Sequence, residues 1–94
     1  MKQTKYLVKT TALFKKDFKR AIKQGRKIEF LEKIITSLAM GEELSEKYKD
    51  HGLTGNWLGY RECHIQPDWL LIYRIDQDVL VLILARTGSH SHLF

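Results

Sequence analysis

The pattern of hydrophobic and polar positions indicates a central hairpin at residues 59–75, around which the rest of the chain is organised. Residues 60–65 and 69–75 are rich in strand-forming side chains, and Gln66, Pro67 and Asp68 join them. Proline presets the φ angle of a turn, and aspartate can hydrogen-bond the local backbone. Two antiparallel strands connected by a tight turn are therefore predicted here.

Two amphipathic helices are predicted before the hairpin, after a short first strand at residues 5–9. The first helix covers residues 11–24, with Thr10 or Thr11 as its N-cap. The second covers residues 26–39 and ends at Gly41. Apolar residues recur at helical spacing in both, which predicts core packing rather than a cofactor site. They are Phe14, Phe18, Ala21 and Ile22, followed by Ile28, Leu31, Ile34, Ile35 and Leu38.

The most hydrophobic segment, residues 79–84, follows a turn at residues 76–78. This segment and residues 69–75 are apolar on both faces, as central strands are. We predict a single-domain α+β fold over residues 1–94 in the order β-α-α-β-β-β. The sheet is mostly antiparallel, with two antiparallel helices on one face. Its other face must contact the C-terminal tail, the polar loop at residues 42–54, or another chain.

Composition places the chain in the cytoplasm, without a membrane partner. No apolar run reaches the length of a membrane span, and the N-terminus lacks the apolar stretch of a signal peptide. Cys63 is the only cysteine and falls within a predicted strand, where a small buried hydrophobe fits.

Charge is divided unevenly along the chain. Residues 1–27 hold ten lysines and arginines against Asp17 alone, a net charge of +9. Residues 28–94 carry a net charge of −4, which gives +5 for the whole chain. A basic segment of this kind indicates a polyanion or an acidic protein as partner. A solvated lysine-rich helix face would give the same pattern.

The histidines are confined to the loop, the hairpin and the C-terminal tail. They are His51, His64, His90 and His92. If Cys63 and Ile65 point into the core, alternation turns His64 towards solvent. These three segments could meet at one edge of the sheet, and histidine is suited to giving and taking protons near neutral pH.

Metal-free cleavage of RNA is a chemistry that these residues could perform. It requires a base for the 2′-hydroxyl, an acid for the departing 5′-oxygen and positive charge near the phosphorane. The residues that fit these roles, in that order, are Asp68 or His64, His90, and Arg86. Trp69 and Phe94 are suited to stacking bases of single-stranded RNA.

Each of these residues also has a structural alternative. Asp68 can simply brace the turn after Pro67, and both tryptophans can belong to the core. A zinc site is a further alternative, although its spacing matches no common zinc pattern. Its ligands would be His90 and His92 with His51, His64 or Cys63.

Three motifs occur in order in the second half of the chain. They are Tyr48-Lys-Asp-His51-Gly-Leu, Trp57-x-Gly59-Tyr-Arg-x-x-His64-x-x-Pro67-Asp-Trp-x-Leu-Ile-Tyr73, and Arg86-Thr-Gly-Ser-His90-x-x-Leu-Phe94. In order and rough spacing they resemble the YafQ-type toxins of the RelE/ParE superfamily of toxin–antitoxin systems. The resemblance covers about residues 45–94, and the N-terminal strand and helices agree in layout only.

This resemblance implies a ribosome-dependent mRNA interferase that cuts mRNA in the ribosomal A site without a metal or other cofactor. A cognate antitoxin would hold it inactive, and their complex would bind its own operator DNA through the antitoxin. The basic segment would face ribosomal RNA, and the uncovered sheet face would face the antitoxin.

The resemblance also implies a set of active residues, namely His51, His64, Asp68, Trp69, His90 and Phe94. His64 or Asp68 resembles the family's general base, and His90 resembles its general acid. His92 stands where a small residue is expected, so no role is transferred to it, and its nearness to His90 leaves open which of the two donates the proton.

Two interpretations from other functional classes accompany this one. A ParE-like inhibitor of DNA topoisomerase would share the fold but would not need this set of histidines. The other interpretation is a catalytically silent RNA-binding or repressor subunit. Cleavage of mRNA in a translating extract separates the first interpretation from both.

Overall fold

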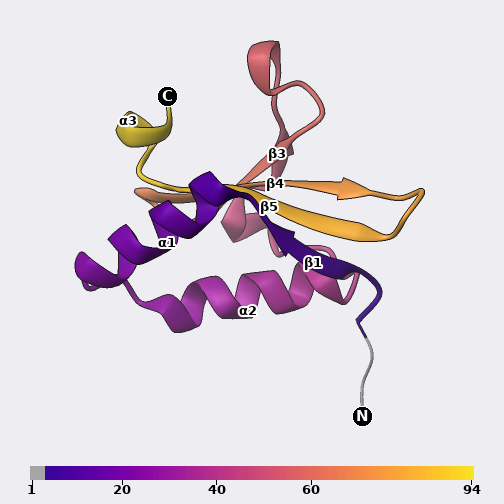
Figure 1. Ribbon diagram of the computed structural model, residues 1–94, viewed down its shortest axis with the longest axis horizontal. Helices are drawn as coiled ribbons and strands as arrows, with labels where there is room; N and C mark the ends of the chain where they lie inside the picture. Colours follow the sequence, from indigo (N-terminus) through magenta and orange to yellow (C-terminus); the bar gives the residue numbers. More distant parts are fainter. Residues whose placement is uncertain (1–3) are drawn as a thin grey trace.

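A computed structural model describes residues 4–94 as a five-stranded sheet with two long helices on one face (Figure 1). The α+β prediction, with its order β-α-α-β-β-β, is confirmed, and short additional elements occur in the loop and the tail. The elements are β1 (Leu7–Thr10), α1 (Ala12–Lys23), α2 (Ile28–Ala39), η1 (Glu46–Tyr48), β2 (His51–Gly52), η2 (Gly55–Trp57), β3 (Arg61–Gln66), β4 (Trp69–Asp76), β5 (Val81–Gly88) and α3 (His90–Leu93). The first three residues of the basic segment lie outside the described residues.

The sheet has the order β1-β5-β4-β3-β2, with β1 parallel to β5 and every other pair antiparallel. The central hairpin is β3 and β4, joined at Pro67 and Asp68 as predicted. The final strand begins and ends later than the predicted residues 79–84. Leu80 has a φ of 53°, which belongs to a turn, and the pairing of β5 with β4 continues through Thr87 and Gly88. The prediction followed the apolar residues 79–84 and therefore missed the more polar second half of β5, residues 85–88.

Helix α1 begins where Thr11 caps it, because the Thr11 hydroxyl accepts a hydrogen bond from the Phe14 N–H at 3.0 Å. Phe14 and Ala21 are buried as predicted, whereas Ile22 is 53% exposed. Asp17 is buried on the inner face of the helix instead. The predicted apolar stripe of α1 was therefore wrong at one end, and a carboxylate lies within it.

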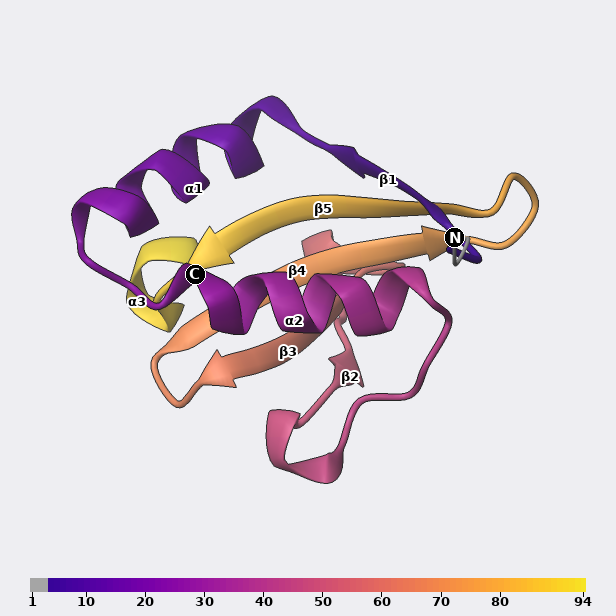
Figure 2. The same ribbon diagram turned by 90° about the horizontal axis from the view of Figure 1, so that it is seen from below.

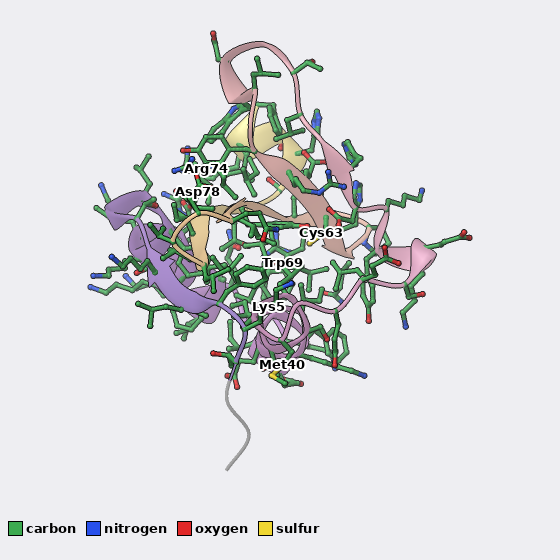
Figure 3. The ribbon with its side chains drawn as sticks, turned by 90° about the vertical axis from the view of Figure 1, so that its right-hand side faces the viewer. Lys5, Met40, Cys63, Trp69, Arg74 and Asp78 are labelled. Atoms are coloured by element: carbon green, nitrogen blue, oxygen red, sulfur yellow. The ribbon has the colours of Figure 1, made fainter. Side chains whose placement is uncertain are left out.

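Helix α2 starts at Ile28, two residues later than predicted, after a turn in which Gly25 has a φ of 73°. Figure 2 shows α2 lying across β4 and α1 beside β5. The larger core lies between these helices and the sheet. Its fully buried members include Leu31, Cys63, Trp69, Leu71 and Leu82. Figure 3 shows Cys63 and Trp69 inside this layer.

The opposite face of the sheet is covered by the segment around η2 and by α3, as Figure 1 shows. Leu70, Ile72, Ala85 and Leu93 form a small buried cluster there, with Trp57 among the residues packed against it. The C-terminal tail thus supplies cover for the second face, as we predicted, and the polar loop contributes Leu53. Trp57 and Tyr60, which follow the predicted loop, supply the rest. The polar loop is not structureless, since it contains η1 and β2.

Within residues 4–94, no helix is both long enough and apolar enough to cross a membrane.

Candidate active site

Two histidines flank a buried carboxylate on the sheet face opposite α1 and α2. His51 in β2 pairs across the strands with Glu62 in β3, and His64 follows two residues later on the same side of β3. Glu62 Oε1 lies 3.7 Å from His51 Nε2 and 3.5 Å from His64 Nε2. The Glu62 side chain is only 7% exposed, whereas those of His51 and His64 are 51% and 27% exposed. We call these three residues the histidine row.

The backbone before β2 fixes the ring of His51. His51 Nδ1 lies 2.7 Å from the carbonyl oxygen of Lys49, and because a carbonyl can only accept, Nδ1 carries a proton. Lys49 itself has a φ of 50°, a left-handed conformation that is uncommon for residues other than glycine. The turn at Lys49 therefore directs Nε2 of His51 towards Glu62.

Asp50 ties the same loop to the sheet. Its Oδ1 accepts hydrogen bonds from the Tyr73 hydroxyl at 2.7 Å and from Arg61 Nε at 3.2 Å. Burial, followed by the hydrogen bond to Asp50, raises the pKa of Tyr73 far above its usual range. Tyr73 therefore stays protonated and acts as a donor that holds the loop in place.

The C-terminal tail presents His90 and Phe94 on the same side of the sheet as the histidine row. Ser89 caps α3, and the buried side chain of Leu93 anchors it in the smaller core. The rings of His90 and Phe94 are 5.0 Å apart, and Phe94 also meets Trp57 edge-on at 6.5 Å. Phe94 is half exposed, so it shields one side of His90 without belonging to the core.

Strand register relates the tail to the histidine row. His64 pairs with Leu70 of β4, and Leu70 pairs with Gly88 of β5, two residues before His90. Because adjacent strands are about 4.8 Å apart, the backbone at His64 and at Gly88 is separated by roughly 10 Å. The loop, the hairpin and the tail therefore meet on one face of the sheet, with β4 between the histidine row and α3.

Arg86 forms a bidentate ion pair with the buried Asp17 of α1. Its Nε and Nη2 donate to Asp17 Oδ2 and Oδ1 at 3.0 and 2.9 Å. The hydrogen bond to Asp17 raises the pKa of Arg86, and the Arg86 side chain keeps 20% of its surface exposed. Asp17 Oδ2 also accepts from the Thr87 N–H at 3.2 Å. Arg86 is thus held by α1, and its role towards a phosphate stays a prediction.

His92 faces away from His90. Its ring contacts Arg20 of α1, and its Nε2 lies 3.8 Å from Asp17 Oδ1. The two tail histidines therefore have different surroundings, one against Phe94 and one against α1. Sequence spacing alone could not separate them.

The prediction that Trp69 stacks on a base is wrong for this structure. Successive side chains of β4 point to opposite faces of the sheet, so Trp69 points towards the helices while Leu70 points away from them. The Trp69 side chain is therefore 0% exposed. The guanidinium of Arg26 lies 5.3 Å from its ring. Asp68 is 82% exposed and lies 3.9 Å from Arg26 Nη1. The turn thus directs Asp68 to a partner on the helix side, and no contact joins it to the histidine row.

The zinc alternative finds no support in the described part of the chain. No three histidine, cysteine, aspartate or glutamate side chains within residues 4–94 are grouped so that they could hold a metal ion. Cys63 is fully buried, and burial raises the pKa of its thiol to about 12. A thiol of this kind is a poor source of the thiolate that binds zinc.

Two carboxylates near the site, Glu62 and Asp17, were not predicted from the sequence. Alternation along residues 60–65 puts Glu62 on the same face as His64, and this was the available signal for its position beside the histidines. Asp17 is the only acidic residue in the basic segment, and it falls at helical spacing from Phe14 and Ala21. An acid within an apolar stripe indicates a buried ion pair.

Comparison with known proteins agrees with this geometry. Residues 6–94 match the family model described as the bacterial toxin of type II toxin–antitoxin systems, YafQ. The mRNA interferase toxin YafQ of Escherichia coli K12 is 40% identical over 82 residues, which cover 86% of this chain and 87% of that protein.

Two crystal structures are similar over nearly the whole chain. A metal-bound toxin from Helicobacter pylori has a TM-score of 0.89 and 43% identity, covering 95% of this chain and 99% of that one. The YafQ chain of the Escherichia coli DinJ–YafQ toxin–antitoxin complex has a TM-score of 0.88 and 36% identity, covering 96% and 98%. The chain therefore belongs to the YafQ family of toxins of type II toxin–antitoxin systems.

Proposed function

We propose that this chain is an mRNA interferase, an endoribonuclease that cleaves mRNA in the ribosomal A site and so inhibits translation. The observation that carries the proposal is the placement of His51, His64 and His90, which come from three separate segments and lie on one face of the sheet. A relative that is 40% identical bears the name mRNA interferase toxin, which supports the same activity.

The proposed reaction is an intramolecular transesterification of the RNA backbone. His64 takes the proton of the 2′-hydroxyl, and the 2′-oxygen attacks the adjacent phosphorus. The bond from phosphorus to the 5′-oxygen breaks, and His90 gives its proton to that oxygen. The products are a 2′,3′-cyclic phosphate and a free 5′-hydroxyl, so atoms and charges balance without a further reactant.

His64 fits the base better than Asp68 does. Its Nε2 lies 3.5 Å from the buried carboxylate of Glu62, which stabilises the imidazolium that forms when His64 takes the proton. Asp68 is largely solvated and its ion-pair partner is Arg26. His51, on the other side of Glu62, adds a second positive group close to the phosphate when it is protonated.

We propose that this acid–base chemistry uses no metal ion. The Helicobacter pylori toxin is metal-bound, whereas no group of three histidine, cysteine, aspartate or glutamate side chains within residues 4–94 of this chain is arranged to hold a metal ion. Cleavage should therefore persist after the toxin is stripped with chelator, when magnesium for the ribosome is held constant. Loss of activity under those conditions, restored by a transition metal, would overturn the metal-free mechanism.

The partner that inhibits the toxin is proposed to be a cognate antitoxin, as DinJ is for YafQ in the related complex. The exposed lysines of α1 suit an acidic or amphipathic partner, and a stable complex would bury at least about 1,000 Å². Co-expression with the product of the neighbouring gene should rescue growth. Equal toxicity with and without that product would reject this inhibitor.

The proposed activity is tested with purified protein in a translating extract. Primer extension should map cuts within codons, the cuts should require ribosomes, and the antitoxin should suppress them. Inhibition of DNA supercoiling by topoisomerase, measured in parallel, should be absent. Intact mRNA together with inhibited supercoiling would instead support the ParE-like alternative.

A further inference from the structure

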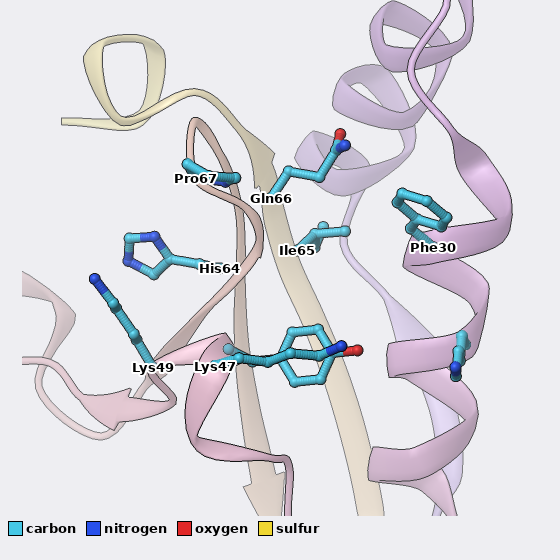
Figure 4. Close-up of a pocket in the computed structure, with 9 residues that line it drawn as sticks. Phe30, Lys47, Lys49, His64, Ile65, Gln66 and Pro67 are labelled. Carbon is cyan, nitrogen blue, oxygen red and sulfur yellow. The ribbon is translucent and has the colours of Figure 1, made fainter.

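A pocket of about 490 Å³ lies directly beside the histidine row, along the end of β3 that extends beyond its pairing with β2. Helix α2, the segment from η1 to Lys49, and the end of β3 form its walls. Figure 4 shows Phe30 on one side, with His64 and Lys49 on the other. His64 therefore belongs to both the histidine row and the pocket.

The positive charge of the pocket favours an anionic ligand. Lys33, Lys47 and Lys49 line it, and no carboxylate does. Within residues 4–94, none of these lysines is ion-paired with an acidic side chain. The neighbouring Asp50 is bound to Tyr73 and Arg61, so it does not neutralise them.

The apolar surface of the pocket suits a flat ring. Phe30 is 41% exposed on α2, and the partly buried Tyr48 lines the pocket from η1. The ammonium group of Lys47 lies 5.0 Å from the Tyr48 ring centroid. Aromatic rings interleaved with lysines are the means by which proteins bind single-stranded nucleic acid without reading its sequence.

We propose that this pocket binds single-stranded RNA on the 5′ side of the cleaved bond. The inference rests on the proposed function, in which His64 takes the proton of the 2′-hydroxyl. That hydroxyl belongs to the nucleotide on the 5′ side, and the leaving 5′-oxygen lies towards His90, beyond β4. The RNA would therefore run from the pocket, past His64, to α3.

The first test measures RNA binding separately from cleavage. The probe is a fluorescein-labelled single-stranded RNA that is fully 2′-O-methylated and so cannot be cut. Replacing Lys47 and Lys49 by alanine, or Phe30→Ala, should weaken binding roughly tenfold to a hundredfold. The matched control replaces Lys15 and Lys19 by alanine, which removes the same charge from the exposed surface of α1 outside the pocket. It measures the general electrostatic effect of two lysines on RNA binding, and the loss in the pocket variant should exceed it.

Salt dependence and a conservative variant separate charge from folding. Each lost phosphate contact should lower the slope of log affinity against log salt by roughly 0.7. Replacing both lysines by arginine should restore binding, and unfolding curves should be unchanged in all variants. If the alanine variants bind RNA normally, the pocket is not an RNA site. Weakened antitoxin binding with unchanged RNA affinity would assign it to a protein partner instead.

The second test determines the direction of the RNA. An uncleavable mRNA on ribosomes carries 4-thiouridine on either side of the mapped cut. The label on the 5′ side should crosslink to the peptides that contain Phe30 or Tyr48, and the label on the 3′ side should not. The reverse pattern would overturn the assignment. Absence of cleavage by the wild-type protein would reject the proposed function, whereas the binding test would still decide whether the pocket holds RNA.

Discussion

The two faces of the sheet are built from the same strands but differ in almost every physical property. The face under α1 and α2 carries a continuous apolar core, in which Leu31, Trp69 and Leu82 are fully buried. The opposite face has a small apolar cluster, a short terminal helix and partly exposed histidines. One face supplies stability and the other is available for chemistry.

Alternation along the central strands produces this division. Trp69, Leu71 and Tyr73 point towards the helices, whereas Leu70 and Ile72 point to the opposite face. A substitution of a buried residue should therefore act on the free energy of unfolding, and one of a partly exposed histidine or aromatic residue on the second face should act on cleavage. Substitutions on each face can test this separation.

His64→Ala should reduce single-turnover cleavage by roughly 10²–10⁴, because the proposed mechanism uses His64 as the base for the 2′-hydroxyl. The free energy of unfolding should change by no more than about 0.5 kcal/mol, since the side chain is partly exposed at the end of β3. Single-turnover cleavage on programmed ribosomes and urea unfolding measure the two quantities. A large loss of stability with normal cleavage by the folded fraction would give His64 a structural role.

Leu31→Ala should show the opposite behaviour. Leu31 is completely buried in α2, and removing such a side chain typically costs about 2–5 kcal/mol. The remaining folded protein should cleave at the wild-type rate, as measured at a temperature where the variant is folded. A cleavage defect in the folded fraction would show that the two faces are coupled.

Deletion of Phe94 should lower cleavage roughly tenfold to a hundredfold, which corresponds to about 1–3 kcal/mol of lost stacking. The residue is half exposed and contacts His90 and Trp57, whereas the adjacent Leu93 is buried. Unfolding and antitoxin binding should remain nearly unchanged. Leu93→Ala is the matched comparison, and it should mainly reduce stability.

Asp68→Ala should have the smallest effect on folding, within about 0.5 kcal/mol, because the side chain is 82% exposed. If His64 is the base, cleavage should also fall much less than in His64→Ala. A loss of cleavage equal to that of His64→Ala would transfer the role of base to Asp68.

Local patterns in the sequence were sufficient to predict the main elements of the fold. Pro67 and Asp68 marked the hairpin, the pair Thr10 and Thr11 marked the start of α1, and helical spacing identified the buried face of α2. These features depend on neighbouring residues, so they can be read along the chain. The resemblance of three motifs then led to the family, which the comparisons confirm.

Contacts between distant segments were not predictable in the same way. Asp17 pairs with Arg86 across 69 positions, and neither residue alone indicates the other. The inward direction of Trp69 depends on the register of the hairpin, because a shift by one residue would turn it to the other face. The separation of His90 from His92 depends on how α3 packs against α1 and the sheet.

The pair His90 and His92 offers the most direct test of the claim that the open face performs the chemistry. The measurement is single-turnover cleavage of mRNA on programmed ribosomes by His90→Ala and by His92→Ala, each with an unfolding curve. We predict a loss of roughly 10²–10⁴ for His90→Ala with unchanged stability, and near-normal cleavage by the folded fraction of His92→Ala. Full activity of His90→Ala, or a larger loss in His92→Ala, would contradict this account.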